Sequence, residues 1–266
     1  MRLAAIQLNA RADRQRNLER CARLLARARQ QGARLALLPE NFAIMPENDT
    51  MRAAHIEDAA SSRTLAFLRT QARTLGMYII AGGLLLREGM SEKPYNRCVV
   101  IGPAGDDVAH YDKMHLFDAA LEAGDYRESK LVQRGRRPVV ARLPELRCGL
   151  SICYDLRFPE LYRHYATRGC SLLTVSAAFT EQTGRAHWEL LLRARAIENQ
   201  CYVLAAAQWG AHPDGRRTWG HSMIVDPWGA VLACLPEGEG VIVADFAPAQ
   251  LREVRRRLPA LAHRRL

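Results

Sequence analysis

The chain has 266 residues, of which 48% are hydrophobic, and a formal net charge of +10 at pH 7. This length and apolar content exclude an intrinsically disordered protein and allow one large domain with a sizeable core. No apolar run is long enough to cross a bilayer, and the apolar start at residues 2–8 passes at once into polar sequence, so we expect neither a membrane span nor a signal peptide.

The basic residues are almost all arginines. Only three of the 38 lysines and arginines are lysines, at positions 93, 113 and 130. The arginines are spread over predicted helices without a nucleic-acid-binding signature, so we interpret them as solvated helix faces and expect no nucleic-acid or membrane partner. The positive field of the whole chain can still attract an anionic small molecule.

The seven cysteines are odd in number and scattered along the chain. None is spaced from another cysteine or a histidine as in a zinc site, so we expect no metal centre. This use of cysteine fits a reducing compartment, and we expect a cytoplasmic protein.

The first half of the chain alternates short apolar runs, which predict strands, with two amphipathic helices. The strands are predicted at 2–8, 33–38, 77–86, 95–101 and 108–111. Helices are predicted at 13–31, ended by Gly32, and at 62–75, ended by Gly76. Residues 43–57 are predicted to form a polar loop.

The second half begins with a predicted polar loop at 117–137 and continues with strands and helices. We predict strands at 139–143, 148–152, 171–175, 201–207 and 241–245, a hairpin of 222–226 with 230–235, and helices at 156–168 and 186–199. Because several strands are adjacent in sequence, the pattern predicts two sheets with helices outside them, in a single domain over 1–266. The basic tail, about 247–266, is expected to pack on this domain or to form an oligomer contact.

Cys153 is the first candidate for chemistry. It follows the apolar run 148–152 directly, and residues 154–160 are predicted to open a helix. At such a turn, backbone N–H groups and the positive end of a helix dipole are expected to lower the pKa of a thiol and can hold an oxyanion. Most cysteines are inert packing residues, so this feature alone leaves both interpretations open.

Glu40 and Lys113 also stand at the ends of apolar strands, where layered α/β folds build their sites. If these residues meet Cys153, the thiol can act as a nucleophile and Glu40 as the base that takes its proton and later activates water. Lys113 can stabilise the oxyanion, which an arginine fork would not do equivalently. The reaction class predicted by this set is acyl transfer from nitrogen.

Three stretches carry a family resemblance: 37–40 (LLPE), 111–116 (YDKMHL) and 149–160 (GLSICYDLRFPE). In this order they resemble the signature stretches of the nitrilase superfamily of carbon–nitrogen hydrolases. The resemblance implies an α-β-β-α sandwich, a Glu40–Lys113–Cys153 triad, a thioester intermediate and no cofactor. It also implies that Glu128 hydrogen-bonds the lysine and that the backbone N–H of Tyr154 completes an oxyanion hole.

Within the family, four stretches at 186–198, 200–203, 205–208 and 220–229 resemble the deaminated-glutathione amidase branch. That resemblance implies hydrolysis of deaminated glutathione to 2-oxoglutarate and cysteinylglycine. The alternatives are an ω-amidase acting on 2-oxoglutaramate, another aliphatic amidase or carbamoylase, and a non-catalytic binding protein on the same fold. The resemblance also implies a homodimer or larger homo-oligomer.

Other polar and aromatic residues near the motifs have two interpretations each. Phe179 is expected either to form a wall of the substrate pocket or to lie in the core. Arg157 could face a substrate carboxylate or form a local salt bridge. His115 and His187 lie near the motifs, but the sequence assigns no role to either.

Overall fold

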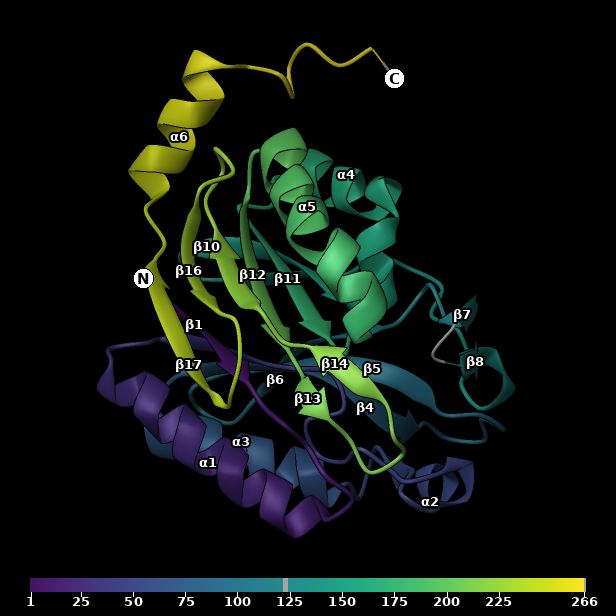
Figure 1. Ribbon diagram of the computed structural model, residues 1–266. Coiled ribbons are helices and arrows are strands. Elements are labelled where there is room, and N and C mark those ends of the chain that lie inside the picture. Colours follow the sequence, from purple (N-terminus) through teal and green to yellow (C-terminus); the bar gives the residue numbers. More distant parts are fainter. Residues whose placement is uncertain (122–123, 266) are drawn as a thin grey trace.

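Two β-sheets stacked face to face form the centre of the molecule, with helices on both outer faces (Figure 1). The structure, a computed structural model, describes residues 1–121 and 124–265. The predicted α-β-β-α sandwich is confirmed. No helix within the described residues has both the length and the apolar character needed to cross a membrane.

The first sheet has the strand order β17-β1-β2-β4-β5-β6, with β3 beside β4. Its strands are β1 (Arg2–Gln7), β2 (Leu35–Leu38), β3 (Glu57–Asp58), β4 (Tyr78–Arg87), β5 (Tyr95–Ile101), β6 (Asp107–Asp112) and β17 (Gly240–Asp245). Strand β2 is parallel to β1 and to β4, whereas β5 and β6 follow in antiparallel order. The parallel pairing sets Leu38, the last residue of β2, beside Ala81 in β4.

The second sheet has the strand order β16-β15-β12-β11-β10-β9. Its strands are β9 (Val140–Leu143), β10 (Leu146–Ile152), β11 (Leu172–Ala177), β12 (Tyr202–Ala207), β15 (Ser222–Val225) and β16 (Val231–Leu235). Two short pairs lie outside both sheets: β7 (Asp118–Leu121) with β8 (Gly124–Arg127), and β13 (Trp209–Ala211) with β14 (Arg217–Trp219).

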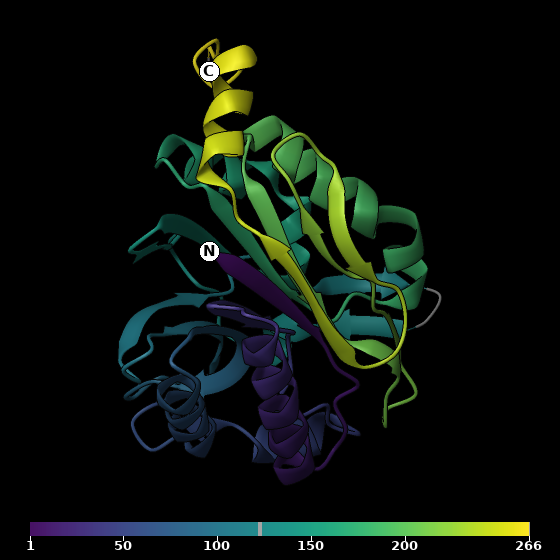
Figure 2. The same cartoon turned by 90° about the vertical axis from the view of Figure 1, so that its left-hand side faces the viewer.

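The alternation of side chains along the strands divides the apolar residues into two clusters. In β1, Leu3 and Ala5 face the layer between the sheets, while Ala4 and Ile6 face helices on the outer side. Helices α1 (Arg14–Gln30) and α3 (Arg63–Leu75) cover the first sheet, and α4 (Pro159–Thr167) and α5 (Glu181–Asn199) cover the second (Figures 1 and 2). The core therefore spans both sheets and anchors the strand ends that carry the site.

Helix boundaries follow capping residues. Asp13 accepts a hydrogen bond from the backbone N–H of Arg16, and Ser62 accepts one from Leu65, so both side chains cap helix N-termini. Gly76 ends α3 in the left-handed region at φ +58°, as its position in the sequence predicted. Helix α6 (Pro248–Arg257) projects from one end of the sandwich (Figure 1). Its Arg255 donates to the carbonyl oxygens of Gln200 and Cys170.

Four local predictions were wrong. The helix after Cys153 begins later, because Cys153–Arg157 forms a 3-10 turn, η2, and Pro159 starts α4. Helix α5 begins at Glu181 rather than at 186, because Thr180 caps it. The predicted loop 43–57 contains α2 (Asp49–Ala54) and β3. The predicted loop 117–137 contains β7, β8 and the 3-10 helix η1 (Glu128–Lys130), while its residues 122–123 lie outside the described residues.

Candidate active site

Three strand ends deliver three polar side chains to one place. Glu40 lies two residues beyond β2, Lys113 follows β6, and Cys153 follows β10. The first two come from one sheet and the third comes from the other, so stacking of the sheets brings them together. All three line one cavity of about 740 Å³.

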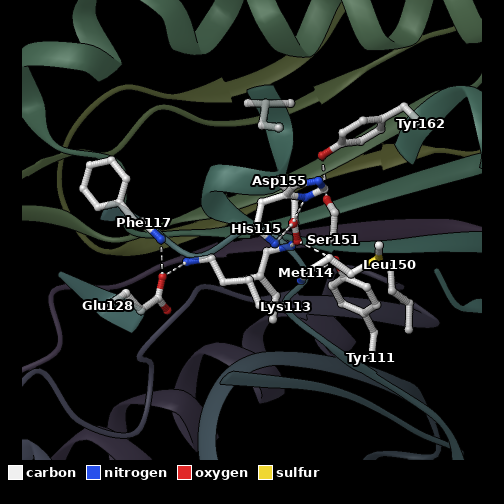
Figure 3. A network of polar contacts seen from close by, with 12 residues as sticks. Tyr111, Lys113, Met114, His115, Phe117, Glu128, Leu150, Ser151, Asp155 and Tyr162 are labelled. Carbon is white, nitrogen blue, oxygen red and sulfur yellow. Dashed lines mark hydrogen bonds and ion pairs between the residues drawn. The ribbon is translucent and has the colours of Figure 1, made fainter. Parts of the chain in front are cut away.

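Lys113 is buried between two carboxylates. Its Nζ lies 3.1 Å from Oε1 of Glu40 and 2.9 Å from Oε2 of Glu128, a contact drawn in Figure 3. Burial lowers the pKa of Lys113, but the charges of Glu128 and Glu40 outweigh burial and raise that pKa well above its usual value. The ammonium therefore stays charged in the enclosed site.

Glu128 is fixed by three donors. Besides the Lys113 ammonium, it accepts hydrogen bonds from Nδ2 of Asn96 at 2.8 Å and from the backbone N–H of Phe117 at 2.7 Å. Burial raises the pKa of Glu128, yet Lys113 and these donors lower it more, so the net shift is downward. The lowered pKa favours the carboxylate form of Glu128 beside the Lys113 ammonium.

The Cys153 thiol is buried, and its pKa is raised well above the usual value. Burial is the largest cause and the charge of Glu40 adds to it, while Lys113 opposes both. The expectation of a lowered thiol pKa was wrong, because desolvation and a facing carboxylate outweigh the short η2 turn. The resting nucleophile is therefore a neutral thiol, which has to lose its proton when it attacks.

The backbone at Cys153 is held in an uncommon conformation. Its φ is +48°, in the left-handed region that non-glycine residues seldom adopt. A side chain on such a turn between a strand and a helix is directed away from both elements, so the conformation presents the sulfur to the cavity. The helix dipole expected at this point is limited to the five residues of η2.

Asn96 is a site residue that sequence reasoning missed. It lies in β5, and its Nδ2 donates to Oε1 of Glu40 at 3.0 Å as well as to Glu128. The backbone N–H of Ala178 donates to the other oxygen of Glu40, at 3.1 Å. The only signal in the sequence is an amide at the start of a strand whose later residues, Cys98–Ile101, are apolar. Together these donors fix the two carboxylates around the lysine.

Asp155 connects the lysine segment with the cysteine segment (Figure 3). Its fully buried carboxylate accepts hydrogen bonds from the Tyr111 hydroxyl at 2.8 Å and from the backbone N–H of His115 at 3.1 Å. It also accepts one from the backbone N–H of Ile152, the residue before Cys153, at 2.9 Å. Asp155 therefore ties the two segments together.

His115 is turned toward this carboxylate rather than toward the nucleophile. Its Nδ1 lies 2.7 Å from Oδ1 of Asp155, and its ring stacks on Phe158 with centroids 3.8 Å apart. His115 does not line the cavity that contains Cys153. Through these contacts, His115 helps to hold the segment after Lys113 in place.

Residues 2–256 match the carbon–nitrogen hydrolase family. The chain belongs to this family. The hydrolase is 44% identical over 265 residues to the deaminated glutathione amidase of Synechocystis sp., covering 98% of this chain and 97% of the relative. Family membership makes the chain an enzyme that hydrolyses carbon–nitrogen bonds.

Solved structures agree with this fold. The hydrolase superposes on the NitFhit protein of C. elegans with a TM-score of 0.91 at 37% identity; the match covers 99% of this chain and 65% of that chain, just under two thirds of its length. It superposes on the amidase from Nesterenkonia sp. AN1 with a TM-score of 0.81 at 29% identity, covering 97% and 98% of the two chains. That second structure is a glutamate-to-glutamine mutant showing Michael addition of acrylamide at its active site cysteine.

Three further predicted site residues of the hydrolase form a cluster beside the cavity and are not among its lining residues. The Arg157 guanidinium lies 5.1 Å from the Phe179 ring centroid and 5.8 Å from that of Tyr154. Phe179 packs on Trp188 at 4.9 Å, and Arg157 lies 3.2 Å from Nδ1 of His187. The residues beside Phe179, Ala178 and Thr180, line the cavity instead.

Within the described part of the hydrolase, no group of three His, Cys, Asp or Glu side chains is placed to hold a metal ion. Among the residues that line the cavity, the Cys153 thiol, the Lys113 ammonium and the carboxylates of Glu40 and Glu128 form the central polar group. Such a set can donate and accept protons and can stabilise an oxyanion.

Proposed function

We propose that this hydrolase cleaves deaminated glutathione into 2-oxoglutarate and cysteinylglycine through a thioester on Cys153. The observation that carries the chemistry is the contact of the Lys113 ammonium with Glu40 and Glu128 in the cavity that contains the Cys153 thiol. The substrate assignment rests on the 44% identity to a deaminated glutathione amidase over nearly the full length of both chains.

In the first half of the reaction, Glu40 takes the thiol proton as the sulfur attacks the amide carbonyl carbon. The carbonyl oxygen becomes an oxyanion, which the Lys113 ammonium and the backbone N–H of Tyr154 stabilise. When the C–N bond breaks, Glu40 returns its proton to the leaving nitrogen. Cysteinylglycine departs, and the 2-oxoglutaryl group stays on Cys153 as a thioester.

In the second half, Glu40 takes a proton from a water molecule that attacks the thioester carbon. The same two donors stabilise the second oxyanion. The C–S bond then breaks, the sulfur recovers the proton from Glu40, and 2-oxoglutarate leaves. Because Glu128 is held as a carboxylate by three donors, Glu40 is the group left to exchange protons.

The proposal is tested by comparing kcat/KM for deaminated glutathione, 2-oxoglutaramate and a simple aliphatic amide such as propionamide. We expect the highest value for deaminated glutathione. The highest value for 2-oxoglutaramate would instead identify an ω-amidase, and the highest value for propionamide would identify a general aliphatic amidase. Absence of turnover with all amides would leave a binding protein on the same fold.

We further propose that the hydrolase forms a homodimer. On α5, Trp188 and Leu192 are buried within the chain, whereas Leu190 and Ile197 are 69% and 49% exposed. Exposed apolar side chains on one helix support a contact between copies. Sedimentation equilibrium should give twice the chain mass, and Leu190→Glu should shift that value toward one chain mass.

A further inference from the structure

Besides Lys113, five cationic side chains line the cavity that contains Cys153. They are Arg52, Arg127, Lys130, Arg216 and Arg217. Three of them form ion pairs with N–O distances of 3.2 Å or less: Arg127 with Asp125, Arg216 with Asp214, and Arg217 with Glu181. Lys130 is exposed, so water solvates its charge. Arg52 is less exposed than Lys130, and its ion pair, with Asp49, is longer than those three at 3.7 Å.

Arg52 is a largely buried cation with weak compensation. Its side chain is 23% exposed, and its Nε is buried without a hydrogen-bond partner among the residues that the structure describes. Within the same described residues, its ion pair is with Asp49, whose Oδ1 lies 3.7 Å from Nε. Asp49 is 97% exposed, so water screens this interaction strongly.

The surroundings of Arg52 disfavour its charge. Burial is the largest cause that lowers the pKa of Arg52, and the nearby Arg216 lowers it further. Asp49, Glu128 and Asp214 oppose this downward shift without reversing it, and arginine stays protonated in proteins, so the side chain keeps its charge. The charge of Glu128 also acts on Arg52, which places the guanidinium within electrostatic reach of the catalytic group.

We propose that Arg52 binds the carboxylate at the 2-oxo acid end of the substrate. This inference rests on the proposed function and adds the group that recognises the charged end of the acyl half. A guanidinium matches a carboxylate through two parallel N–H···O bonds, which a lysine cannot reproduce. A carboxylate bound there neutralises a cation that is already mostly removed from water.

The order of the chemistry explains why this partner lies inside the cavity. Cysteinylglycine leaves after the first step, whereas the 2-oxoglutaryl group stays attached to Cys153 until water releases it. Its carboxylate therefore needs a cationic partner through both steps. Arg52 is the mostly buried cation of the cavity that has neither a well-placed carboxylate nor bulk water as its partner.

Two amides that differ only at this end test the contact. 2-Oxoglutaramate carries the carboxylate, and 4-oxopentanamide has a methyl group in its place on the same carbon chain. We expect Arg52→Gln to lower the ratio of their kcat/KM values by roughly 10- to 100-fold, the range of a hydrogen bond to a charged group. Because both amides are measured on the same variant, a partial folding defect cancels. Arg52→Lys should lie between wild type and Arg52→Gln.

Arg217→Gln is the matched control, since Arg217 lines the same cavity but is exposed and paired with Glu181. It should keep the wild-type ratio. An unchanged ratio in Arg52→Gln would overturn the proposal, and so would an equal fall in Arg217→Gln. A loss that appears instead between deaminated glutathione and its glycine amide would assign Arg52 to the leaving half and also overturn it.

A binding measurement separates this proposal from the substrate assignment. Calorimetry measures the affinity of wild type and of Arg52→Gln for 2-oxoglutarate and for 4-oxopentanoate, which lacks the carboxylate at the 2-oxo acid end. This measurement needs no turnover. Tighter binding of 2-oxoglutarate that disappears in Arg52→Gln supports the Arg52 contact even if deaminated glutathione is a poor substrate. Equal preferences in both proteins would sink the contact even if deaminated glutathione is the best substrate.

Discussion

Asn96 is the residue whose two contacts are most informative about how the site is held. Its amide donates to both Glu40 and Glu128, so it fixes the two carboxylates on either side of Lys113. The sequence could not reveal it, because a single amide in a strand usually marks a solvent-facing position. Only the stacked sheets show that this position faces the site.

We predict that Asn96→Ala lowers kcat by roughly 10- to 100-fold, since two buried carboxylates lose a donor of about 1.5–3 kcal/mol. The matched control is Asn199→Ala, which also removes a buried amide, one that donates to the backbone of Arg195 at the far end of α5. Steady-state kinetics on both variants, with thermal unfolding to check the fold, makes the comparison. Equal losses of kcat in the two variants would show that the loss of any buried amide lowers kcat, and would contradict a specific role for Asn96.

His212 makes the stability of the fold depend on pH. It is 4% exposed, and burial is the main cause that lowers its pKa from 6.5 to about 4. Its ring bonds the Ala10 carbonyl oxygen and the Thr218 hydroxyl. Between these two pKa values the unfolded chain binds a proton that the folded chain does not, so stability is complete above pH 6.5 and falls toward pH 4.

The corresponding prediction is a loss of about 3 kcal/mol of unfolding free energy from this residue as the pH falls from 6.5 to 4. Urea unfolding at both pH values measures it in wild type and in His212→Gln. We expect the variant to lose less stability on acidification than wild type does. Parallel losses in the two proteins would show that other groups carry the acid sensitivity.

At the scale of elements, the strand that carries the nucleophile packs unusually closely on its helix. A Cβ added at Gly149 in β10 would lie 2.5 Å from ring atoms of Tyr165 in α4. The ring has little freedom to move, because its hydroxyl donates to the Leu150 carbonyl oxygen at 2.5 Å. This close approach sets how near β10, and therefore Cys153, lies to α4.

Gly149→Ala is accordingly predicted to destabilise the protein by about 1–3 kcal/mol, as overpacking does. In a strand without such a contact, replacing glycine by alanine stabilises the protein by roughly 0.5–1 kcal/mol. The sign of the change in unfolding free energy therefore shows whether the contact with Tyr165 dominates. Chemical denaturation measures the difference in unfolding free energy between the variant and wild type. In a Tyr165→Leu background the cost should shrink, and an undiminished cost there would locate the strain elsewhere.

The sequence was informative about elements wherever apolar runs were long enough. Glu40 and Cys153 could be placed at strand ends because mostly apolar runs precede them, whereas Lys113 follows the mixed strand Asp107–Asp112. The three-residue strands β13 and β14 and the hairpin β7–β8 were missed, because such short segments carry no periodicity. The pKa of Cys153 could not be read from local sequence, since it depends on burial in the folded site and on the charges of Glu40 and Lys113 from the other sheet.

At the scale of the whole molecule, the net charge of +10 should act on a charged substrate. We predict that kcat/KM for deaminated glutathione falls by roughly two- to tenfold as salt rises from about 20 mM to about 0.15 M, because salt screens long-range attraction. The neutral 4-oxopentanamide is the control and should show little change. An equal fall for both amides would attribute the salt effect to the enzyme rather than to attraction.

The central claim is that Cys153 carries the acyl group during turnover. The most direct measurement is rapid acid quenching of the hydrolase with deaminated glutathione, followed by digestion and mass spectrometry of the cysteine peptides. The account predicts a 2-oxoglutaryl group on Cys153 and none on Cys148, five residues earlier in the same strand-and-turn segment. An acyl group on Cys148 or on any other cysteine, with Cys153 unmodified during turnover, would contradict it.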